Sequence, residues 1–378
     1  MHPKLIDTLS KYSTIILVGW GTGGHIQPIL SLASELERKK LLWIGWKDSN
    51  EEIEAKKANI SFKGISILKL TTTRSPKILL YPFFLLLGIF DTKVILNSII
   101  KEYKENQMWG LQNEEIMRLL TVPWWKEKIC VFSKWWPWSV AIGIAASSLW
   151  IPLFIHESDT IPGRSNRILG KLATRIFLGF ECAKQYFNPE KCEIIGQILG
   201  ASFVKEVPEG RRISRENQNK ISPTTLYKEG INWKTDKTHI LVICGSQGSQ
   251  VIFREILGSF QNHDTYEWII ALGKLNEWMK KDFENMKNTQ ALEWISQEDI
   301  ASLLGNTQIA ITRGSATTLA EIDIFGVKKI IIPLPYSAEN HQYWNAREYA
   351  KKWDILLEQK NLDQLHQIIQ NIWQSSQH

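Results

Sequence analysis

A glycine-rich turn is the first stretch of the chain whose residue types could do chemistry. Residues 19–28 read Gly-Trp-Gly-Thr-Gly-Gly-His-Ile-Gln-Pro and join an apolar run at 14–18 to an amphipathic stretch at 29–36. Glycine permits positive φ and close approach of the backbone to a ligand, and the N-terminus of the following helix favours negative charge. The turn therefore predicts a site for a phosphate or a sugar oxygen.

A second turn, Gly245-Ser246-Gln247-Gly248-Ser249, repeats this arrangement after the apolar run 239–244. Its backbone N–H groups and two hydroxyls could cradle a diphosphate, although Gly/Ser turns between strand and helix are common. Further on, the turn Thr312-Arg313-Gly314-Ser315-Ala316 opens a helix that carries Glu321. A carboxylate there could accept hydrogen bonds from two ribose hydroxyls, while a solvated helix glutamate is the more frequent case.

Two more polar clusters follow apolar runs. The segment 339–346, Glu-Asn-His-Gln-Tyr-Trp-Asn-Ala, is a polar helix start that could contact sugar hydroxyls. The segment 156–159, His-Glu-Ser-Asp, ends a strand and leads into a helix that carries Asn166. Polar groups at the carboxyl ends of parallel strands point into the ligand-binding crevice of an open sheet. For His156, a structural histidine with satisfied hydrogen bonds remains the default interpretation.

Short apolar runs alternate with helical patterns along the chain, which predicts α/β structure with two doubly wound parallel sheets. The polar, aperiodic stretch 205–237 is interpreted as a linker with a surface excursion, so we predict domains at 1–200 and 201–378. Strands are expected near 14–19, 41–45, 65–69, 128–133, 151–156, 174–178, 192–195, 239–244, 266–271, 289–294, 308–312, 328–332 and 354–357. Helices are expected near 26–38, 50–58, 77–104, 139–149, 164–171, 182–187, 249–260, 276–286, 297–304, 316–325, 339–352 and 361–374.

The composition of the 378 residues limits the partners. A net charge of +6 suits an anionic partner, but no dense Lys/Arg run or aromatic RNA-binding motif indicates nucleic acid. The four cysteines show no CxxC spacing and are expected to be reduced structural thiols. The apolar stretch 78–90 is shorter than the roughly 20 residues that span a bilayer. It is either a core helix or a surface that enters a membrane beside Lys69, Arg74, Lys77 and Lys93.

In their order and separations, the motifs Gly-Thr-Gly-Gly-His, His-Glu-x-x-x-x-x-Gly-x-x-Asn, Gly-Ser-Gln-Gly, Arg-Gly-Ser-Ala and His-Gln-x-x-Asn-Ala together resemble the MurG family. These enzymes are UDP-N-acetylglucosamine:lipid I transferases of peptidoglycan synthesis. The resemblance runs from about Thr14 to Leu362. It implies a GT-B fold of two Rossmann-like domains that face a cleft, an inverting transfer of N-acetylglucosamine to the 4-hydroxyl of lipid I, and lipid II as product.

The resemblance also implies roles for individual residues. His25 is the candidate base for the acceptor hydroxyl, since an unperturbed imidazole titrates near neutral pH. The implied acceptor side comprises Thr22, Gly23, Gly24, Glu157 and Asn166, and the implied donor side comprises Ser246, Gln247, Gly248, Ser249, Arg313, Ser315, Glu321, His341, Gln342 and Asn345.

No metal site and no tightly bound cofactor are implied, because helix N-termini would stabilise the donor phosphates and UDP-N-acetylglucosamine is a substrate. The expected location is the cytoplasmic face of the cell membrane, as a peripheral protein attached through 78–90 and its basic flank. The helix 361–374 is expected to pack back on the N-terminal domain. The chain departs from the family at 196–200, Gly-Gln-Ile-Leu-Gly, where MurG proteins commonly have Asn-Pro-Val-Arg, and at Asp159, where asparagine is frequent.

Two other functions stay open. One is a different GT-B enzyme, such as a UDP-N-acetylglucosamine 2-epimerase or a glycolipid glycosyltransferase. The other is a non-catalytic protein that binds nucleotide-sugars, which requires that Trp20, Trp135 and Trp136 are genuine.

Tryptophan is unusually frequent, with 17 residues against 14 Phe and 9 Tyr. Several tryptophans stand where local patterns or the resemblance ask for glycine. Trp150 and Trp353 each follow a predicted helix and precede a strand, where glycine in left-handed conformation is favoured. We hypothesise that the gene reads UGA as glycine and that these positions were translated as tryptophan. The alternative is a truly Trp-rich protein. The positions in question are Trp20, Trp46, Trp135, Trp136, Trp150 and Trp353.

Overall fold

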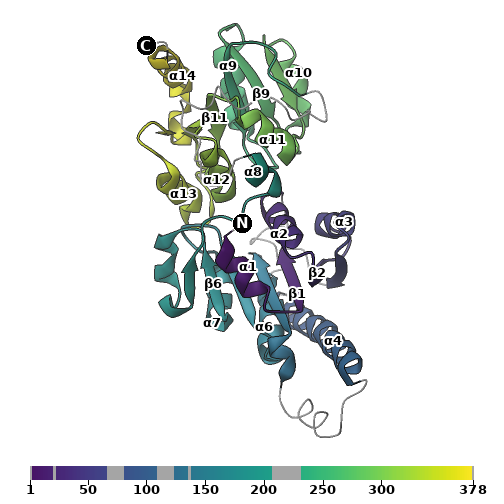
Figure 1. Cartoon of the computed structure of the whole chain (residues 1–378). Coiled ribbons are helices and arrows are strands. Elements are labelled where there is room, and N and C mark those ends of the chain that lie inside the picture. Colours follow the sequence, from purple (N-terminus) through teal and green to yellow (C-terminus); the bar gives the residue numbers. More distant parts are fainter. Residues whose placement is uncertain are drawn as a thin grey trace. The chain divides into compact units, whose positions relative to one another are not determined.

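The computed structural model describes residues 2–19, 23–65, 81–108, 123–134, 138–206 and 231–376. The chain divides into two compact units, Met1–Ile198 and Leu199–His378. Each unit is built around its own parallel sheet (Figure 1). The units are described separately below.

The first unit contains a seven-stranded sheet of order β3-β2-β1-β4-β5-β6-β7 in which all pairings are parallel. Thr14 at the start of β1 pairs with Lys40 on one side and Ile129 on the other. All six residues of β1 are buried, because the central strand of a doubly wound sheet is covered on both faces. The strands are β1 (Thr14–Gly19), β2 (Lys40–Trp46), β3 (Ser61–Ile65), β4 (Ile129–Lys134), β5 (Leu153–Glu157), β6 (Arg175–Leu178) and β7 (Cys192–Ile194).

Helices of the first unit cover both faces of this sheet. Ile16 and Val18 of β1 belong to the core on one face, and Ile15 and Leu17 belong to the core on the other. This division follows from the two-residue period of a strand. The helical segments are α1 (Pro3–Leu9), α2 (Gly23–Glu35), α3 (Asn50–Lys57), α4 (Tyr81–Met108), η2 (Trp124–Glu127), α6 (Ser139–Ser148), α7 (Arg164–Leu172), η3 (Glu181–Tyr186) and η4 (Pro189–Lys191).

The second unit repeats the plan with a six-stranded parallel sheet of order β10-β9-β8-β11-β12-β13. Its strands are β8 (Thr238–Ile243), β9 (Tyr266–Ala271), β10 (Thr289–Leu292), β11 (Ile309–Thr312), β12 (Lys328–Ile331) and β13 (Ile355–Leu356). Its helical segments are α8 (Ala201–Glu206), α9 (Gln250–Phe260), η6 (Glu277–Met279), α10 (Lys280–Phe283), α11 (Gln297–Leu304), α12 (Ala316–Ile324), η7 (Ala338–Asn340), α13 (His341–Tyr349), η8 (Gln359–Gln364) and α14 (Leu365–Ser376).

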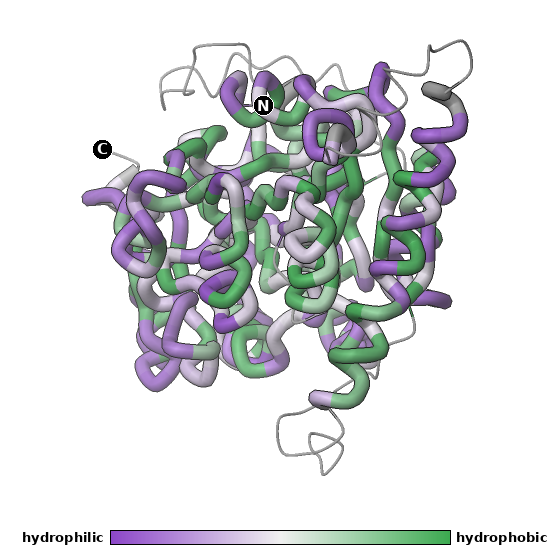
Figure 2. The backbone as a smooth tube through the Cα atoms, turned by 90° about the horizontal axis from the view of Figure 1, so that it is seen from below, coloured by the Kyte–Doolittle hydropathy of each residue, from purple (hydrophilic) through white to green (hydrophobic). Residues whose placement is uncertain are grey.

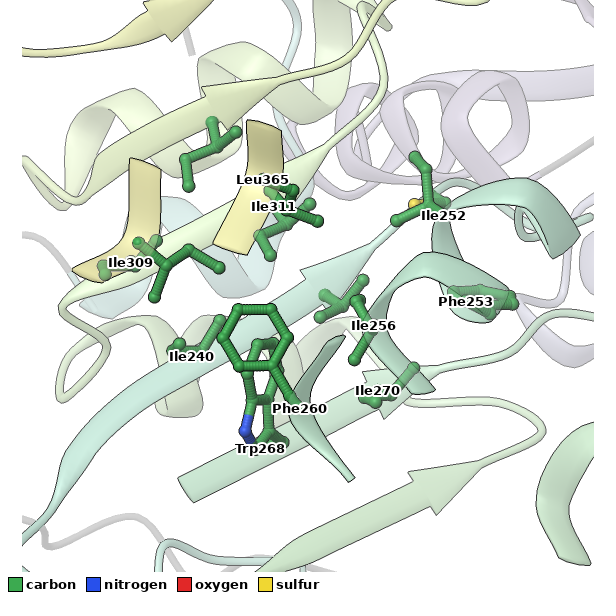
Figure 3. Packing of buried hydrophobic residues seen from close by; sticks show 14 of the residues in the cluster. Ile240, Ile252, Phe253, Ile256, Phe260, Trp268, Ile270, Ile309, Ile311 and Leu365 are labelled. Atoms are coloured by element: carbon green, nitrogen blue, oxygen red, sulfur yellow. The ribbon is translucent and has the colours of Figure 1, made fainter. Parts of the chain in front are cut away.

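An aliphatic and aromatic core holds α9 and α14 against the second sheet (Figure 3). The ring of Phe260 lies 5.0 Å from that of Trp268, centroid to centroid, at the end of α9. Helix α14 buries Leu365 and Ile369 in the same core. The expectation that this last helix packs on the first domain concerns how the units are placed and stays a prediction.

The predicted α/β class with two doubly wound sheets is confirmed. Four of the differences from the expected elements follow. The strand expected at 65–69 is β3 at Ser61–Ile65, and 66–69 lie outside the described residues. Helix α1 was not predicted, although it buries Leu5 and Leu9. The helix expected at 276–286 is a 3-10 turn followed by the short α10.

The fourth difference concerns the stretch interpreted as a linker. Residues 231–237 belong to the second unit, because Ile231 and Trp233 are buried in its core. The carboxylate of Glu267 accepts hydrogen bonds from the backbone N–H groups of Lys234 and Thr235. Residues 205 and 206 are the last residues of α8, and residues 207–230 lie outside the described part.

Helix α4 has one buried face and one exposed apolar face. Gly88, Thr92, Leu96 and Ile99 are buried at helical spacing against the first sheet. In Figure 2 green and purple segments alternate along the peripheral helices, as amphipathic helices require. The stretch Pro82–Glu105 is long and apolar enough to cross a membrane by length and composition, with 22% of its most apolar window buried. Residues 82–90 of the predicted apolar stretch form the first part of this longer helix.

The described tryptophans divide into two groups. Trp150, at the turn after α6, has a left-handed φ of 59° and an exposed side chain. Trp353 does not have positive φ, so its predicted left-handed conformation is wrong. Trp46 ends β2 as its last residue and packs against the core. Positions 20, 135 and 136 lie outside the described residues.

Candidate active site

The loop after β9 contacts the Gly245–Ser249 turn and restricts its backbone to one conformation. Gly245 and Gly248 have φ of 79° and 69°, which side chains with a Cβ rarely adopt. A Cβ on Gly248 would lie 1.7 Å from the carbonyl oxygen of Leu272. The amide of Asn276 donates to the carbonyl of Gln247 at 2.7 Å. Sequence reasoning missed Asn276, since nothing in its local pattern ties it to a turn 29 residues away.

Arg313 lies beneath the same turn and is 8% exposed. Its Nη2 donates to Oγ of Ser249 at 2.6 Å, and its Nη1 donates to the carbonyls of Ile332 and Pro333 at 3.0 and 3.3 Å. The guanidinium thus joins the carboxyl ends of β11 and β12 to the first turn of the unit. Burial lowers the pKa of Arg313 from its ordinary value.

The start of α13 packs closely on the turn after β11. A Cβ on Gly314 would lie 2.1 Å from the carbonyl oxygen of Gln342, so this contact requires glycine. Oε1 of Gln342 accepts from the backbone N–H groups of Gly314 and Leu334 at 3.2 and 3.0 Å. The fully buried Asn345 donates to the Gly314 carbonyl at 3.2 Å. Gln342 is therefore fixed by its oxygen, and its Nε2 is left to donate.

His341 and Glu321 complete the predicted donor residues together with Ser315. Nδ1 of His341 donates to the carbonyl of Ala338 at 2.8 Å, which leaves its Nε2 as an acceptor. Glu321 on α12 is 7% exposed and accepts from Nε2 of Gln297 at 3.5 Å. Ser315 is the half-buried N-cap residue of α12. The structure thus places every predicted donor residue at the carboxyl edge of one sheet or on the helices that follow it.

In the first unit, a buried polar cluster lies at the end of β5. Glu157 is fully buried, and its carboxylate oxygens accept from the backbone N–H of Asp159 at 2.8 Å and from Nδ2 of Asn166 at 2.9 Å. His156 is also fully buried; its Nε2 donates to the carbonyl of Gly196 at 3.0 Å, and its Nδ1 accepts from Ser158 at 3.3 Å. His156 is therefore the structural histidine that the default interpretation expected.

The two adjacent titratable groups are both shifted towards their neutral forms. Burial, followed by the Asp159 charge, raises the pKa of Glu157 to about 8. Burial and the nearby Lys134 lower the pKa of His156 to about 3. The shift of Glu157 is towards the protonated form, and the cluster positions the loop that leads to α7 through the hydrogen bonds that Glu157 accepts from Asp159 and Asn166.

The opening glycine turn is only partly described. The backbone of Gly23, Gly24 and His25 begins α2, directly after the turn that follows β1. Thr22 and the side chain of His25 lie outside the described residues, so their predicted roles stay predictions. The turn after β1 lies where the strand order reverses, between β1 and β4, and open α/β sheets bind their ligands at such a point. The turn after β8 has the same place in the second sheet.

The four cysteines are free thiols, as expected. Among the described residues, no group of three or more His, Cys, Asp and Glu could hold a metal ion. The prediction of no bound cofactor stays a prediction.

Comparison with solved structures shows which fold this is. MurG of Acinetobacter baumannii superposes with a TM-score of 0.62 at 19% identity, covering 96% of this chain and 92% of that one. UDP-GlcNAc 2-epimerase from Neisseria meningitidis, solved with UDP-GlcNAc, gives a TM-score of 0.58 at 15% identity and covers 95% and 93%.

Comparison of sequences identifies the family. Residues 15–110 and 130–178 match the glycosyltransferase family 28 N-terminal domain, and 239–378 match the family 28 C-terminal domain. Fold and sequence together define a glycosyltransferase of the GT-B class. The chain belongs to glycosyltransferase family 28 and, within it, to the MurG enzymes.

Curated relatives resemble the chain over nearly its whole length. A protein of Finegoldia magna is 28% identical over 347 residues, which are 89% of this chain and 82% of the relative. A protein of Bacillus subtilis is 26% identical over 347 residues, which are 89% of this chain and 83% of the relative. Both are named UDP-N-acetylglucosamine--N-acetylmuramyl-(pentapeptide) pyrophosphoryl-undecaprenol N-acetylglucosamine transferase.

Proposed function

We propose that this hexosyltransferase performs the reaction in its relatives' name and transfers N-acetylglucosamine from UDP-N-acetylglucosamine to lipid I, giving lipid II. The observation that carries the proposal is the match to both family domains together with relatives of one function along nearly the whole chain. In the transfer, the acceptor 4-hydroxyl oxygen forms a bond to the sugar C1, and the bond from C1 to the phosphate oxygen breaks. The hydroxyl proton goes to His25, and UDP leaves with the bonding electrons.

The second unit is proposed to bind the donor. The diphosphate would lie at 246–249, where two glycines of positive φ and the N-terminus of α9 favour an anion. Ribose hydroxyls would bind Glu321. Nε2 of Gln342 can only donate and Nε2 of His341 can accept, so the pair matches two neighbouring sugar hydroxyls in opposite senses. No tightly bound metal or cofactor forms part of the proposal.

The first unit is proposed to bind the acceptor. The candidate residues are Thr22, Gly23 and Gly24 at the turn after β1, with Glu157 and Asn166 at the end of β5. Glu157 and Asn166 hydrogen-bond to each other in the buried cluster, which supports a positioning role for them.

Helix α4 is proposed to hold the protein on the cytoplasmic face of the membrane. Exposed apolar side chains recur along one face of its first half, with Phe83 59%, Leu86 65%, Phe90 65% and Val94 53% exposed. Apolar side chains of this size on one helix face bury into the boundary of a bilayer. Lys93 lies on the same helix, and the other predicted basic residues, Lys69, Arg74 and Lys77, lie outside the described part.

Product analysis tests the proposal. The chain is incubated with UDP-N-acetylglucosamine and lipid I, and lipid II is the expected product. Conversion of the donor to its 2-epimer without lipid II would indicate the epimerase alternative, and UDP binding without any product would indicate a binding protein. His25→Ala is expected to lower kcat at least about 100-fold, since general bases contribute that much, while UDP affinity stays unchanged. Turnover close to wild type would remove His25 from the mechanism.

A further inference from the structure

Arg313 is a buried cation that contacts hydrogen-bond acceptors but, among the described residues, no carboxylate. Its guanidinium contacts two backbone carbonyls and the hydroxyl of Ser249. None of the ion pairs among the described residues of the second unit involves it. By contrast, the fully buried Lys329 of the same unit pairs with Asp323 and Asp354.

A buried charge without a counter-ion is costly, and an arginine does not relieve the cost by losing its proton. A bound anion close to the guanidinium would offset that cost. The turn that Arg313 supports is the place where two glycines and a helix N-terminus favour an anion.

Ser249 stands between the guanidinium and that place. It is the N-cap residue of the 11-residue helix α9, but its hydroxyl accepts from no backbone N–H of the helix. The oxygen instead accepts from Nη2 of Arg313 at 2.6 Å, so the hydroxyl hydrogen is left to donate elsewhere. A hydroxyl that accepts from a cation is a stronger donor, because linked hydrogen bonds polarise one another.

We propose that Arg313 is a positioning residue that acts on the donor diphosphate through Ser249, and that the diphosphate is its counter-ion. The guanidinium donates to Oγ of Ser249, and the Ser249 hydroxyl donates to a phosphate oxygen. This inference rests on the proposed function. It separates two residues that the sequence grouped as equivalent donor contacts: Ser249 touches the phosphate, and Arg313 does not.

The arrangement also bears on the transfer itself. Negative charge builds on the UDP leaving group as the bond to the sugar breaks. A fixed positive charge behind the turn stabilises that charge without reorganisation, in the manner of other preorganised sites. The effect on kcat is therefore expected in addition to the effect on binding.

Calorimetric titration of the full chain with UDP and with uridine tests the proposal. Ser249→Ala is expected to weaken UDP binding about 10-fold or more, as loss of a hydrogen bond to a charged group does, and to leave uridine binding unchanged. Ser249→Thr, which keeps the hydroxyl, is expected to restore most of the affinity. Ser259→Ala, at the other end of α9, is the matched control and is expected to bind UDP as wild type does.

A second variant shows whether Arg313 acts through the serine. Arg313→Met is expected to weaken UDP binding but not uridine binding, and to add little further loss when combined with Ser249→Ala. Additive losses would mean that Arg313 acts independently of Ser249, and equal losses for both ligands would mean a structural role only; either result would overturn the proposal. If the arginine variant does not fold, wild-type UDP affinity in Ser249→Ala overturns it alone. Failure of the wild-type chain to bind UDP would instead refute the proposed function.

Discussion

Replacing Trp150 by glycine should stabilise the first unit. Helix α6 ends at Ser148 in a motif with both characteristic bonds: the N–H of Trp150 donates to the carbonyl of Ser147 at 3.1 Å, and that of Ile151 donates to the carbonyl of Ala146 at 3.0 Å. This geometry places residue 150 at φ 59°.

The magnitude follows from two opposing terms. Left-handed backbone costs a residue with a Cβ roughly 1–2 kcal/mol. Glycine loses more chain entropy on folding than tryptophan does, and this loss offsets about 0.4–1 kcal/mol of that gain. The Trp150 side chain is 72% exposed, so its removal sacrifices little buried area. The net expectation is a gain of about 0.5–1 kcal/mol, or a rise in Tm of a few degrees for a unit of this size.

Two sites in the same chain provide controls for thermal unfolding. Asn59 occupies the equivalent position after α3, with φ 55° and the same pair of hydrogen bonds. Asparagine tolerates this conformation, so Asn59→Gly should change Tm little. Trp353 is also a surface tryptophan after a helix but lacks positive φ, so Trp353→Gly should lower Tm. A Trp150→Gly variant no more stable than wild type would refute the reasoning.

The same position tests how the gene is read. Under the hypothesis of UGA read as glycine, the codon for residue 150 is UGA, and mass spectrometry of the protein from its own cells shows glycine there. A UGG codon at this position would eliminate the hypothesis for residue 150.

Further expectations concern pH, the membrane and the donor turn. The pKa of Glu157 is raised from 4.5 to about 8. Its contribution to the free energy of unfolding is therefore complete below about pH 4.5 and is lost as pH rises to about 8. The lowered pKa of His156 acts oppositely, and its contribution is lost as pH falls from 6.5 to about 3. Glu157→Gln should therefore flatten the unfolding free energy between pH 6.5 and 8 in denaturant titrations, and an unchanged slope would contradict this. Leu86→Ser with Phe90→Ser should reduce sedimentation with anionic vesicles without lowering Tm; undiminished sedimentation would exclude this face. Gly248→Ala should abolish UDP binding in calorimetry, because its Cβ would overlap a carbonyl of the facing loop, and retained affinity would show that the turn can shift.

Much of the fold follows from local pattern. The alternation of apolar strands and amphipathic helices depends on periods of two and 3.6 residues that the chain displays directly. This pattern was sufficient to place β1, β8 and their glycine turns, since glycine adopts positive φ more readily than residues with a Cβ. The edge strand β3 was misplaced because edge strands are only half covered and carry a weaker apolar signal; four of its five residues are at least partly exposed.

The sequence by itself determined the class, the two-unit plan and the candidate donor residues, because each motif is contiguous in the chain. Only the tertiary structure decided what those residues do for one another. Arg313 reaches Ser249 across 64 residues, and the burial that shifts Glu157 comes from the elements packed around β5. Such contacts depend on strand order and on desolvation. Both are properties of the folded chain that no local spacing encodes.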